Sequence, residues 1–247
     1  MRPTLVLAAL VAFLVDVHLS AAEPASAPCC AKQAQTPCCP KKPAPPCCPT
    51  ACDSEAGFVN LFKGASMEGW QGTTDGYFFE NGALVCKEDG GGRLLTTKEY
   101  ADFILRFEFK LPPGGNNGIA IRAPLEGRLS RTGIEIQVLD DTADKYKNLK
   151  PYQFHGSVYG LVPAKRGHLK PVGEWNSQEI CVRGTCIRVT LNGAVIVDAD
   201  LSTIDKPMDG YEHPGRFRTK GFVGFMGHRA RVEFRNFRIK ELGGAKT

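Results

Sequence analysis

The chain has 247 residues, ten cysteines and a formal net charge of +5 at pH 7. Its lysines and arginines are scattered rather than gathered in a basic stripe, and no motif that reads DNA or RNA is present, so a nucleic-acid partner is not expected. Residues 1–56 carry four basic and four acidic side chains, which assigns the whole positive excess to the remainder of the chain.

Residues 1–22 have the three parts of a signal peptide. Arg2 provides a positive charge, residues 5–15 form an apolar run, and small residues occupy positions 20–22. The alternative is a membrane anchor, but the run is much shorter than the roughly 20 apolar residues that span a bilayer. We therefore expect cleavage after Ala22, export to the periplasm or the extracellular space, and no membrane span after cleavage.

Residues 23–56 form a linker rich in cysteine and proline, with hardly any large apolar residue. Such a composition cannot build a core and predicts disorder. Pro-Cys-Cys recurs every nine residues, at Pro28, Pro37 and Pro46. Two interpretations stay open: a stalk whose cysteines form disulfides in an oxidising compartment, and a soft-metal site made by paired thiolates.

Residues 57–242 show short runs of alternating apolar residues, separated by Gly, Pro, Asn and Asp. This rhythm is typical of an all-β sandwich of antiparallel strands rather than of alternating strands and helices. Strands are predicted at 78–85, 103–111, 118–122, 133–139, 177–183, 185–191, 195–200, 221–226 and 232–240. The last residues, 243–247, are a tail.

The strand predicted at 133–139 carries polar residues on one face. Alternation places Glu135 and Gln137 on that face and Ile134, Ile136 and Val138 on the other. Because the apolar set must face the core, the polar pair faces the open side of its sheet. It forms either an ordinary solvated surface or part of a site.

A β-hairpin is predicted at residues 180–191, with its turn at Arg183-Gly184 or one residue later. With the first turn, Cys181 lies opposite Cys186 at a closely spaced position, where a disulfide is plausible in an exported protein. A shift of one residue would separate the two thiols. Cys86 has no obvious partner and is expected to be a buried thiol.

Five blocks of sequence in series carry a resemblance to a known family. They are Asn-Asn-Gly-Ile-Ala-Ile-Arg at 116–122, Gly-Ile-Glu-Ile-Gln-Val-Leu-Asp-Asp at 133–141, Gly-Glu-Trp-Asn at 173–176, Leu-Asn-Gly at 191–193 and Val-Glu-Phe-Arg-Asn-Phe-Arg-Ile-Lys at 232–240. In this order and spacing the chain resembles the 3-keto-disaccharide hydrolase family. The resemblance implies a concanavalin A-like jelly roll of two antiparallel sheets. In some members it implies cleavage of glycosides whose C3 hydroxyl has been oxidised to a ketone.

That chemistry sets what a site must contain. A 3-keto group acidifies the C2 hydrogen, so a base can remove it, an electrophile can hold the enolate oxygen, and the glycosidic oxygen can leave with a proton. Given the resemblance, Glu135 and His155 are the candidate catalytic acid and base, and a divalent metal is allowed as the electrophile. The candidate residues for binding a carbohydrate ligand are Arg122, Gln137, Asn117, Tyr159, Trp175 and His228.

Each candidate also has a purely structural interpretation, such as a hydrogen-bonded loop histidine or a core aromatic. The sequence also departs from the family pattern, since Phe225-Met226 stands where Leu-Gln is expected. No nucleophile elbow, zinc helix of the His-Glu-x-x-His type or phosphate-binding loop is present. The alternative to an exported enzyme is therefore a non-catalytic, lectin-like module on a cysteine-rich stalk.

Overall fold

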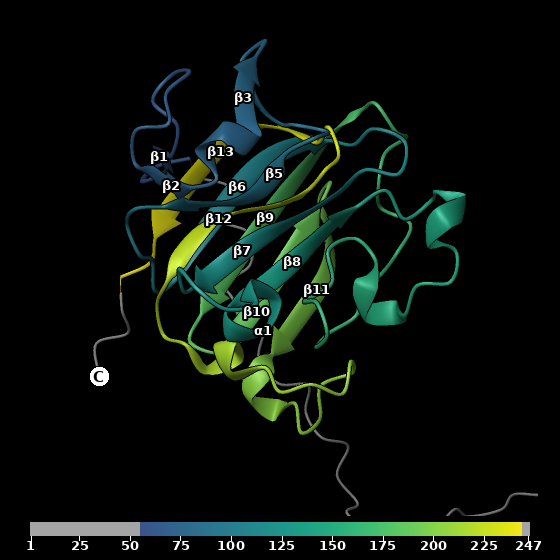
Figure 1. Ribbon diagram of the computed structural model, residues 1–247. Helices are drawn as coiled ribbons and strands as arrows, with labels where there is room; N and C mark the ends of the chain where they lie inside the picture. The colour runs from purple at the N-terminus through teal and green to yellow at the C-terminus, as the bar shows by residue number, and fades with distance from the viewer. Residues whose placement is uncertain (1–54, 244–247) are drawn as a thin grey trace, which may run out of the picture. The chain divides into compact units, whose positions relative to one another are not determined.

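The computed structural model describes residues 55–243, which form two antiparallel sheets packed face to face (Figure 1). Sheet A has the strand order β11-β10-β9-β6-β13-β4-β3, with β1 paired to β13, and sheet B has the order β2-β5-β12-β7-β8. This confirms the predicted all-β jelly-roll sandwich. The predicted signal peptide, most of the cysteine-rich linker and the last four residues lie outside the described residues.

The strands have the following bounds. Sheet A contains β1 (Val59–Asn60), β3 (Tyr77–Glu80), β4 (Ala83–Cys86), β6 (Phe103–Lys110), β9 (Trp175–Arg183), β10 (Cys186–Leu191), β11 (Ala194–Asp200) and β13 (Glu233–Glu241). Sheet B contains β2 (Trp70–Gly72), β5 (Gly91–Thr96), β7 (Asn116–Ala123), β8 (Ile134–Leu139) and β12 (Phe222–His228).

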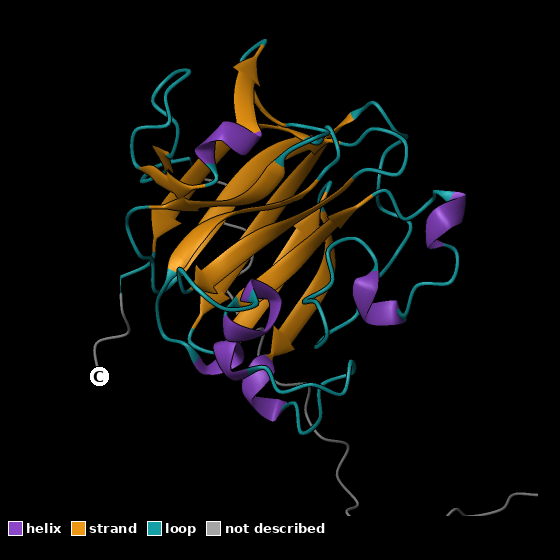
Figure 2. Cartoon of the chain, in the orientation of Figure 1, coloured by secondary structure: helices purple, strands orange, loops and turns teal. Residues whose placement is uncertain are grey.

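Helices are short and lie in the connections between strands (Figure 2). They are α1 (Leu129–Thr132) and 3-10 turns at Thr74–Gly76, Asp144–Tyr146, Pro151–Gln153, Leu201–Thr203 and Pro214–Phe217. Within residues 55–243, none of these helices has the length and apolarity to cross a membrane.

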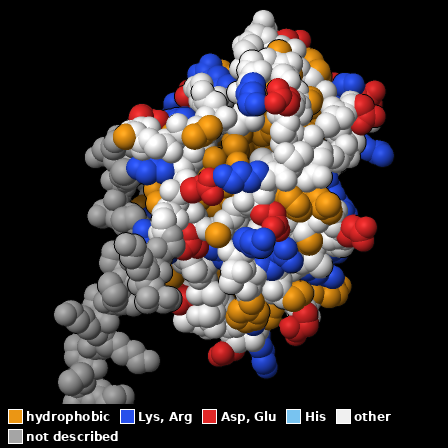
Figure 3. All heavy atoms as spheres, turned by 90° about the vertical axis from the view of Figure 1, so that its left-hand side faces the viewer, with side chains coloured by type: hydrophobic (Ala, Val, Ile, Leu, Met, Phe, Trp, Pro, Cys, Tyr) orange, Lys and Arg blue, Asp and Glu red, His pale blue; other side chains and the backbone are white. Residues whose placement is uncertain are grey.

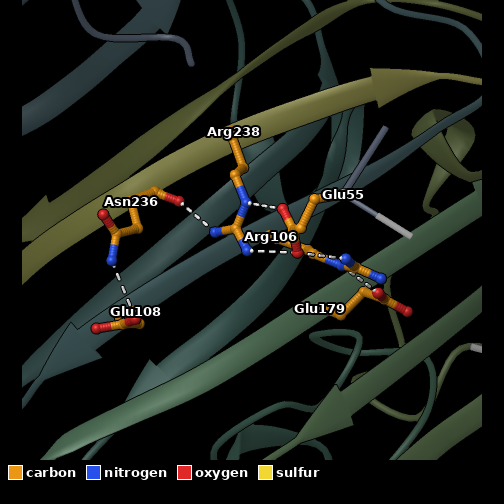
Figure 4. Close-up of polar contacts among 6 residues, drawn as sticks. All are labelled: Glu55, Arg106, Glu108, Glu179, Asn236 and Arg238. Carbon is orange, nitrogen blue, oxygen red and sulfur yellow. Dashed lines mark hydrogen bonds and ion pairs between the residues drawn. The ribbon is translucent and has the colours of Figure 1, made fainter. Parts of the chain in front are cut away.

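The core lies between the two sheets and follows from alternation along each strand. In β6, Phe103, Leu105, Phe107 and Phe109 are buried facing sheet B, as predicted. Phe225 of β12 fills the facing side, with its ring 4.6 Å from those of two phenylalanines of β13. On the opposite, outer face of β6, charged side chains are paired in a network (Figure 4).

The strand predicted at 78–85 is a hairpin instead. Asn81 and Gly82 both have positive φ, 49° and 75°, and form the two-residue turn between β3 and β4. This Asn-Gly pair is a strong hairpin signal that the alternation on both sides concealed. The glycine-rich strand β5 was not predicted, because glycine has a low strand propensity.

The predicted Cys181–Cys186 disulfide is wrong. The turn falls one residue later than the register that would pair the cysteines, so Cys186 pairs with Arg183 and Cys181 pairs with Arg188. Gly184 has φ +56°, the conformation that glycine provides at the first position of a two-residue hairpin turn. No disulfide joins these two cysteines in the described structure, whereas Cys86 is buried, as expected.

Candidate functional site

A cavity of about 300 Å³ opens on the outer face of sheet B. Its wall combines residues from four adjacent strands with residues from the loops after β7 and β8. They are Arg93, Asn116, Arg128, Leu129, Ser130, Glu135, Gln137, Leu139, Tyr146, Leu149, Gln153, Tyr159, Met226 and His228. The face predicted for Glu135 and Gln137 is thus confirmed, since Ile134, Ile136 and Val138 are buried between the sheets.

A second cavity of about 420 Å³ lies beside the β3–β4 hairpin. Its two charged residues, Glu80 and Arg235, are engaged in ion pairs with Arg231 and Glu108. It therefore presents no unpaired acid or base to a ligand. The cavity on sheet B is the better candidate for chemistry.

Glu135 is the chemically distinctive residue of this cavity. The residue is 5% exposed, and no described group hydrogen-bonds its carboxylate. Burial raises the pKa of Glu135 to about 7, and the positive charge of Arg128 acts in the opposite direction. The carboxylate lies over Gly118 of the neighbouring strand, where a Cβ atom would stand 2.4 Å from Glu135 Oε1. The absent side chain at position 118 makes room for the glutamate.

Two side-chain amides line the same cavity, and they do not hydrogen-bond to each other. Gln137 Oε1 and Asn116 Oδ1 are both buried and lack a hydrogen-bond partner in the described structure. Buried polar atoms are nearly always paired in folded proteins, so unpaired ones in a cavity wall point to a ligand or ordered water. Amides that can both donate and accept are suited to sugar hydroxyls.

Tyr159 and His228 complete the wall from two other segments. The loop of Tyr159 runs along the edge of β8, and its backbone N–H donates to the carbonyl of Glu135 at 2.9 Å. The Tyr159 hydroxyl accepts a hydrogen bond from Gln153 at 3.1 Å. His228, at the end of β12, is open to solvent on one side, and partial desolvation lowers its pKa.

His155 does not reach the cavity. It lies between the sheets, 4% exposed and stacked on Phe109 with ring centroids 4.9 Å apart. Its Nδ1 accepts the Leu139 N–H at 3.2 Å, so the proton sits on Nε2, which lies 2.9 Å from Gln178 Oε1. Burial lowers the pKa of His155 to about 4, which keeps the ring neutral. The structure therefore corrects its predicted catalytic role to a link between β8 and β9.

Arg122 also lies away from the cavity. A β-bulge between β7 and β12 reverses the expected alternation, and Arg122 adopts a positive φ of 47°. Its guanidinium is 2% exposed and donates to the carbonyls of Ala101, Gly184 and Arg218 and to the carboxylate of Asp102. All of these partners are protein groups, so the prediction that Arg122 faces a sugar is wrong.

Two further candidates lie away from the cavity. Asn117 alternates to the core side of β7, is fully buried and accepts the Gly118 N–H. Trp175 starts β9 on the outer face of sheet A, where Arg235 stacks 4.0 Å from the ring centroid. Alternation along β7 places Asn117 in the core. Trp175 belongs to sheet A and therefore lies on the opposite side of the sandwich from the cavity. Neither residue lines the cavity.

Sequence reasoning missed several residues of the wall. Alternation along β7 places Asn116 on the cavity face and Asn117 on the core face. The strand predicted at 118–122 begins two residues too late to include Asn116. Arg93 could not be found because its strand was not predicted, and Arg128 lies in a loop. For the divalent metal that the sequence leaves open, no three His, Cys, Asp or Glu side chains converge within residues 55–243.

A jelly-roll sandwich with a cavity of carboxyl, amide and tyrosine groups on one sheet defines a class, the β-sandwich proteins with a polar cavity on one sheet face. The chain belongs to the 3-keto-alpha-glucoside-1,2-lyase-like domain family, whose sequence profile matches residues 57–240. A 3-keto-disaccharide hydrolase of Bacteroides thetaiotaomicron is 26% identical over 230 residues, which cover 75% of this chain and 79% of that protein. The resemblance found in the sequence is thereby confirmed.

Solved structures agree with the fold. Two crystal structures from Parabacteroides distasonis carry the provisional name glycosyl hydrolase. The first is 29% identical with a TM-score of 0.67, covering 75% of this chain and 99% of that chain. The second is 25% identical with a TM-score of 0.65, covering 76% and 95%. A Bacillus subtilis protein with a galectin-like fold, 13% identical with a TM-score of 0.50, shares the fold alone.

Proposed function

We propose that this protein cleaves 3-keto-glycosides in the cavity on sheet B, with Glu135 as the base. The observation that carries the proposal is a buried carboxyl group that accepts no hydrogen bond from residues 55–243 and whose pKa is raised to about 7. A group with that pKa is substantially ionised at neutral pH, so it can accept a proton, and it is more basic than an ordinary carboxylate. The neighbouring unpaired amides supply contacts for a sugar.

The reaction divides into two steps. Glu135 removes the proton from C2, and the electrons form an enolate with the oxygen at C3. The enolate then expels the oxygen at C1, which takes up a proton and leaves as the alcohol. In the second step water adds to C1 and a proton returns to C2, so the sum is hydrolysis of the glycosidic bond.

Other wall residues take the supporting roles. The amides of Gln137 and Asn116 are placed to hold sugar hydroxyls and the enolate oxygen. Tyr159 and His228 are the proton donors within the wall for the leaving oxygen. His155 and Arg122 have no part in this proposal, because protein groups occupy their polar atoms.

We also propose that the protein works outside the cytoplasm. The charged start, the apolar run and the small residues up to Ala22 support this localisation. Sequencing the N-terminus of protein recovered from the periplasm or the medium tests it, and Glu23 is the expected first residue.

The enzymatic proposal is tested with a 3-keto disaccharide and its unoxidised parent. The full chain is expected to release the 3-keto sugar only from the oxidised compound. It should also catalyse exchange of the C2 hydrogen of that compound with deuterium from the solvent. Glu135→Gln removes both reactions, whereas Glu68→Gln, which alters an exposed surface carboxylate, leaves them intact. Absence of turnover and of C2 exchange in the wild type would refute the proposal.

A second function, lectin-like binding without catalysis, is favoured by one observation. Met226 lines the cavity at a position where the family pattern carries glutamine, so the wall has one polar group fewer. In that case glycan binding persists in the wild type and in Glu135→Gln, and no C2 exchange is measured. The same experiment therefore separates the two functions.

A further inference from the structure

Two arginines share one rim of the cavity on sheet B. Arg93, on β5, lies directly opposite Met226 of β12 and donates from Nη1 to the carbonyl of Leu125 at 3.2 Å. Arg128 donates from Nε to Ser130 Oγ at 3.3 Å. Because Leu125 and Arg128 belong to the same loop between β7 and α1, both guanidiniums are held at the same end of the cavity.

Neither guanidinium makes an ion pair with any residue of the described chain. Arginines elsewhere on the domain are mostly paired: Arg106, for example, contacts Glu55 at 2.8 Å and Glu179 at 2.7 Å (Figure 4). Positive and negative side chains are likewise interspersed on the face shown in Figure 3. The cavity wall is therefore a local exception, because it is lined by two arginines that make no ion pair and by a single carboxyl group, the buried Glu135.

The single carboxyl group in the cavity wall, Glu135, makes an ion pair with neither arginine, although the charge of Arg128 acts on its pKa. Glu135 is buried beside Gly118, on the inner part of the wall, and the desolvation that raises its pKa also leaves it partly neutral at pH 7. Met226, opposite Arg93, offers no carbonyl oxygen, in contrast to the glutamine of the family pattern. A neutral sugar would offer neither guanidinium an anionic partner.

We infer that the cavity is built for a glycoside that carries a carboxylate, which Arg93 and Arg128 bind. A guanidinium presents parallel N–H donors that match the two oxygens of a carboxylate, and such charge-assisted bonds are stronger than neutral ones. This inference names the substrate class of the proposed reaction and rests on that reaction for the sugar itself. The acidic sugar is held by the rim while Glu135 and the amides contact the ring.

The inference is tested by calorimetry with disaccharides that carry no ketone at C3 and therefore bind without being cleaved. The probes are a diglucoside, the same compound with one C6 oxidised to a carboxylate, and its 6-sulfate. The full chain is expected to bind the carboxylate about tenfold more tightly than the diglucoside, and more tightly than the sulfate. Because the contacts are exposed charges, added salt should weaken the preference.

Arg93→Gln and Arg128→Gln are each expected to reduce the preference about threefold to fivefold, and together to abolish it. Arg183→Gln is the matched control, since Arg183 is an exposed arginine on the β9–β10 hairpin that does not line the cavity. Equal binding of the three sugars, tighter binding of the sulfate, or an unchanged preference in the double variant would overturn the inference. If the preference holds while 3-keto-glycosides are not cleaved, the proposed reaction fails and the acidic ligand stands.

Discussion

At the scale of single residues, the environment of Glu135 determines both its reactivity and its cost to the fold. A carboxylate buried in the cavity wall loses its hydration and is less stable than a carboxylate in water. This desolvation raises the pKa of Glu135 to about 7. Since the base must be ionised to accept the C2 proton, we expect kcat/KM to fall about tenfold per pH unit below pH 7 and to level off above it. A pH–rate profile measures this, and a profile with no acid limb near pH 7 would contradict it.

The same pKa shift has a consequence for stability. Between pH 4.5 and about 7 the folded state binds more protons at Glu135 than the unfolded state, so its contribution to stability decreases as the pH rises. Glu135→Gln removes the ionisable group. We expect this variant to be more stable than the wild type at pH 8, by an amount on the order of 3 kcal/mol, and equally stable at pH 4. Urea unfolding at both pH values checks the prediction.

Gly118 makes a second prediction at this scale. A methyl group at position 118 would stand 2.4 Å from Glu135 Oε1 and 3.0 Å from its Cδ, so Gly118→Ala must displace the glutamate side chain. We expect turnover of 3-keto-glycosides to fall at least about tenfold, because a catalytic group moved by an ångström loses its alignment. Stability should change less than after a clash with the backbone, since the three nearest atoms all belong to the Glu135 side chain.

A double-mutant cycle provides the control for Gly118. In a Glu135→Ala background the obstructing oxygen is absent, so Gly118→Ala should have no further effect on stability or on sugar binding. A similar effect of Gly118→Ala in both backgrounds would show that the glycine acts on the sheet and not on Glu135.

At the scale of elements, His155 shows how a loop residue can hold two strands together. Its ring bridges Leu139 of β8 and Gln178 of β9, one strand from each sheet. Replacing it with leucine leaves both partners buried and unsatisfied, which should cost about 2–4 kcal/mol at pH 7.5. Thermal or urea unfolding measures this loss, and His168→Leu, at an exposed loop position, is the control.

The pH dependence of this link has the opposite sign to that of Glu135. Because the folded-state pKa of His155 is about 4, against a usual value of 6.5, the unfolded state binds more protons between those values. The contribution of His155 is therefore complete above pH 6.5 and is lost as the pH falls towards 4. His155→Leu should show a flatter stability profile in this window, and an unchanged slope would argue against a neutral, buried ring.

The sequence predicted the face of β8 correctly and failed at the turns, for a physical reason. Alternation is a local property, so Ile134 and Ile136 mark the core side without knowledge of the fold. The register of the β9–β10 hairpin depends on a single glycine conformation, and the direction of Arg122 depends on a bulge set by the partner strand. The position of His155 depends on packing across the sandwich, which no local pattern records.

At the scale of the whole molecule, polar side chains divide between those that hold the sandwich together and those that face the cavity. The two kinds look alike in the sequence, and the structure separates them by whether they line the cavity and by which of their polar atoms have protein partners. Arg122 and His155 have their polar atoms occupied by the fold, whereas Glu135 and Gln137 retain unpaired atoms at the cavity wall. An unpaired atom marks the cavity only in a residue that lines it, because Asn117 Nδ2 and Gln178 Nε2 also lack partners in the described structure and lie away from the cavity.

Arg122 provides the test of this division. Its guanidinium joins the end of sheet B to the β9–β10 turn at Gly184, to Asp102 before β6 and to the loop at Arg218. Arg122→Gln leaves buried carbonyls and Asp102 without their cation, so we expect a loss of at least about 3 kcal/mol in the free energy of unfolding. Turnover per folded molecule, measured well below the unfolding temperature, should equal that of the wild type, because Arg122 does not line the cavity. Arg183→Gln should leave both quantities unchanged. An Arg122 variant with normal stability and lost turnover would return this residue to the site.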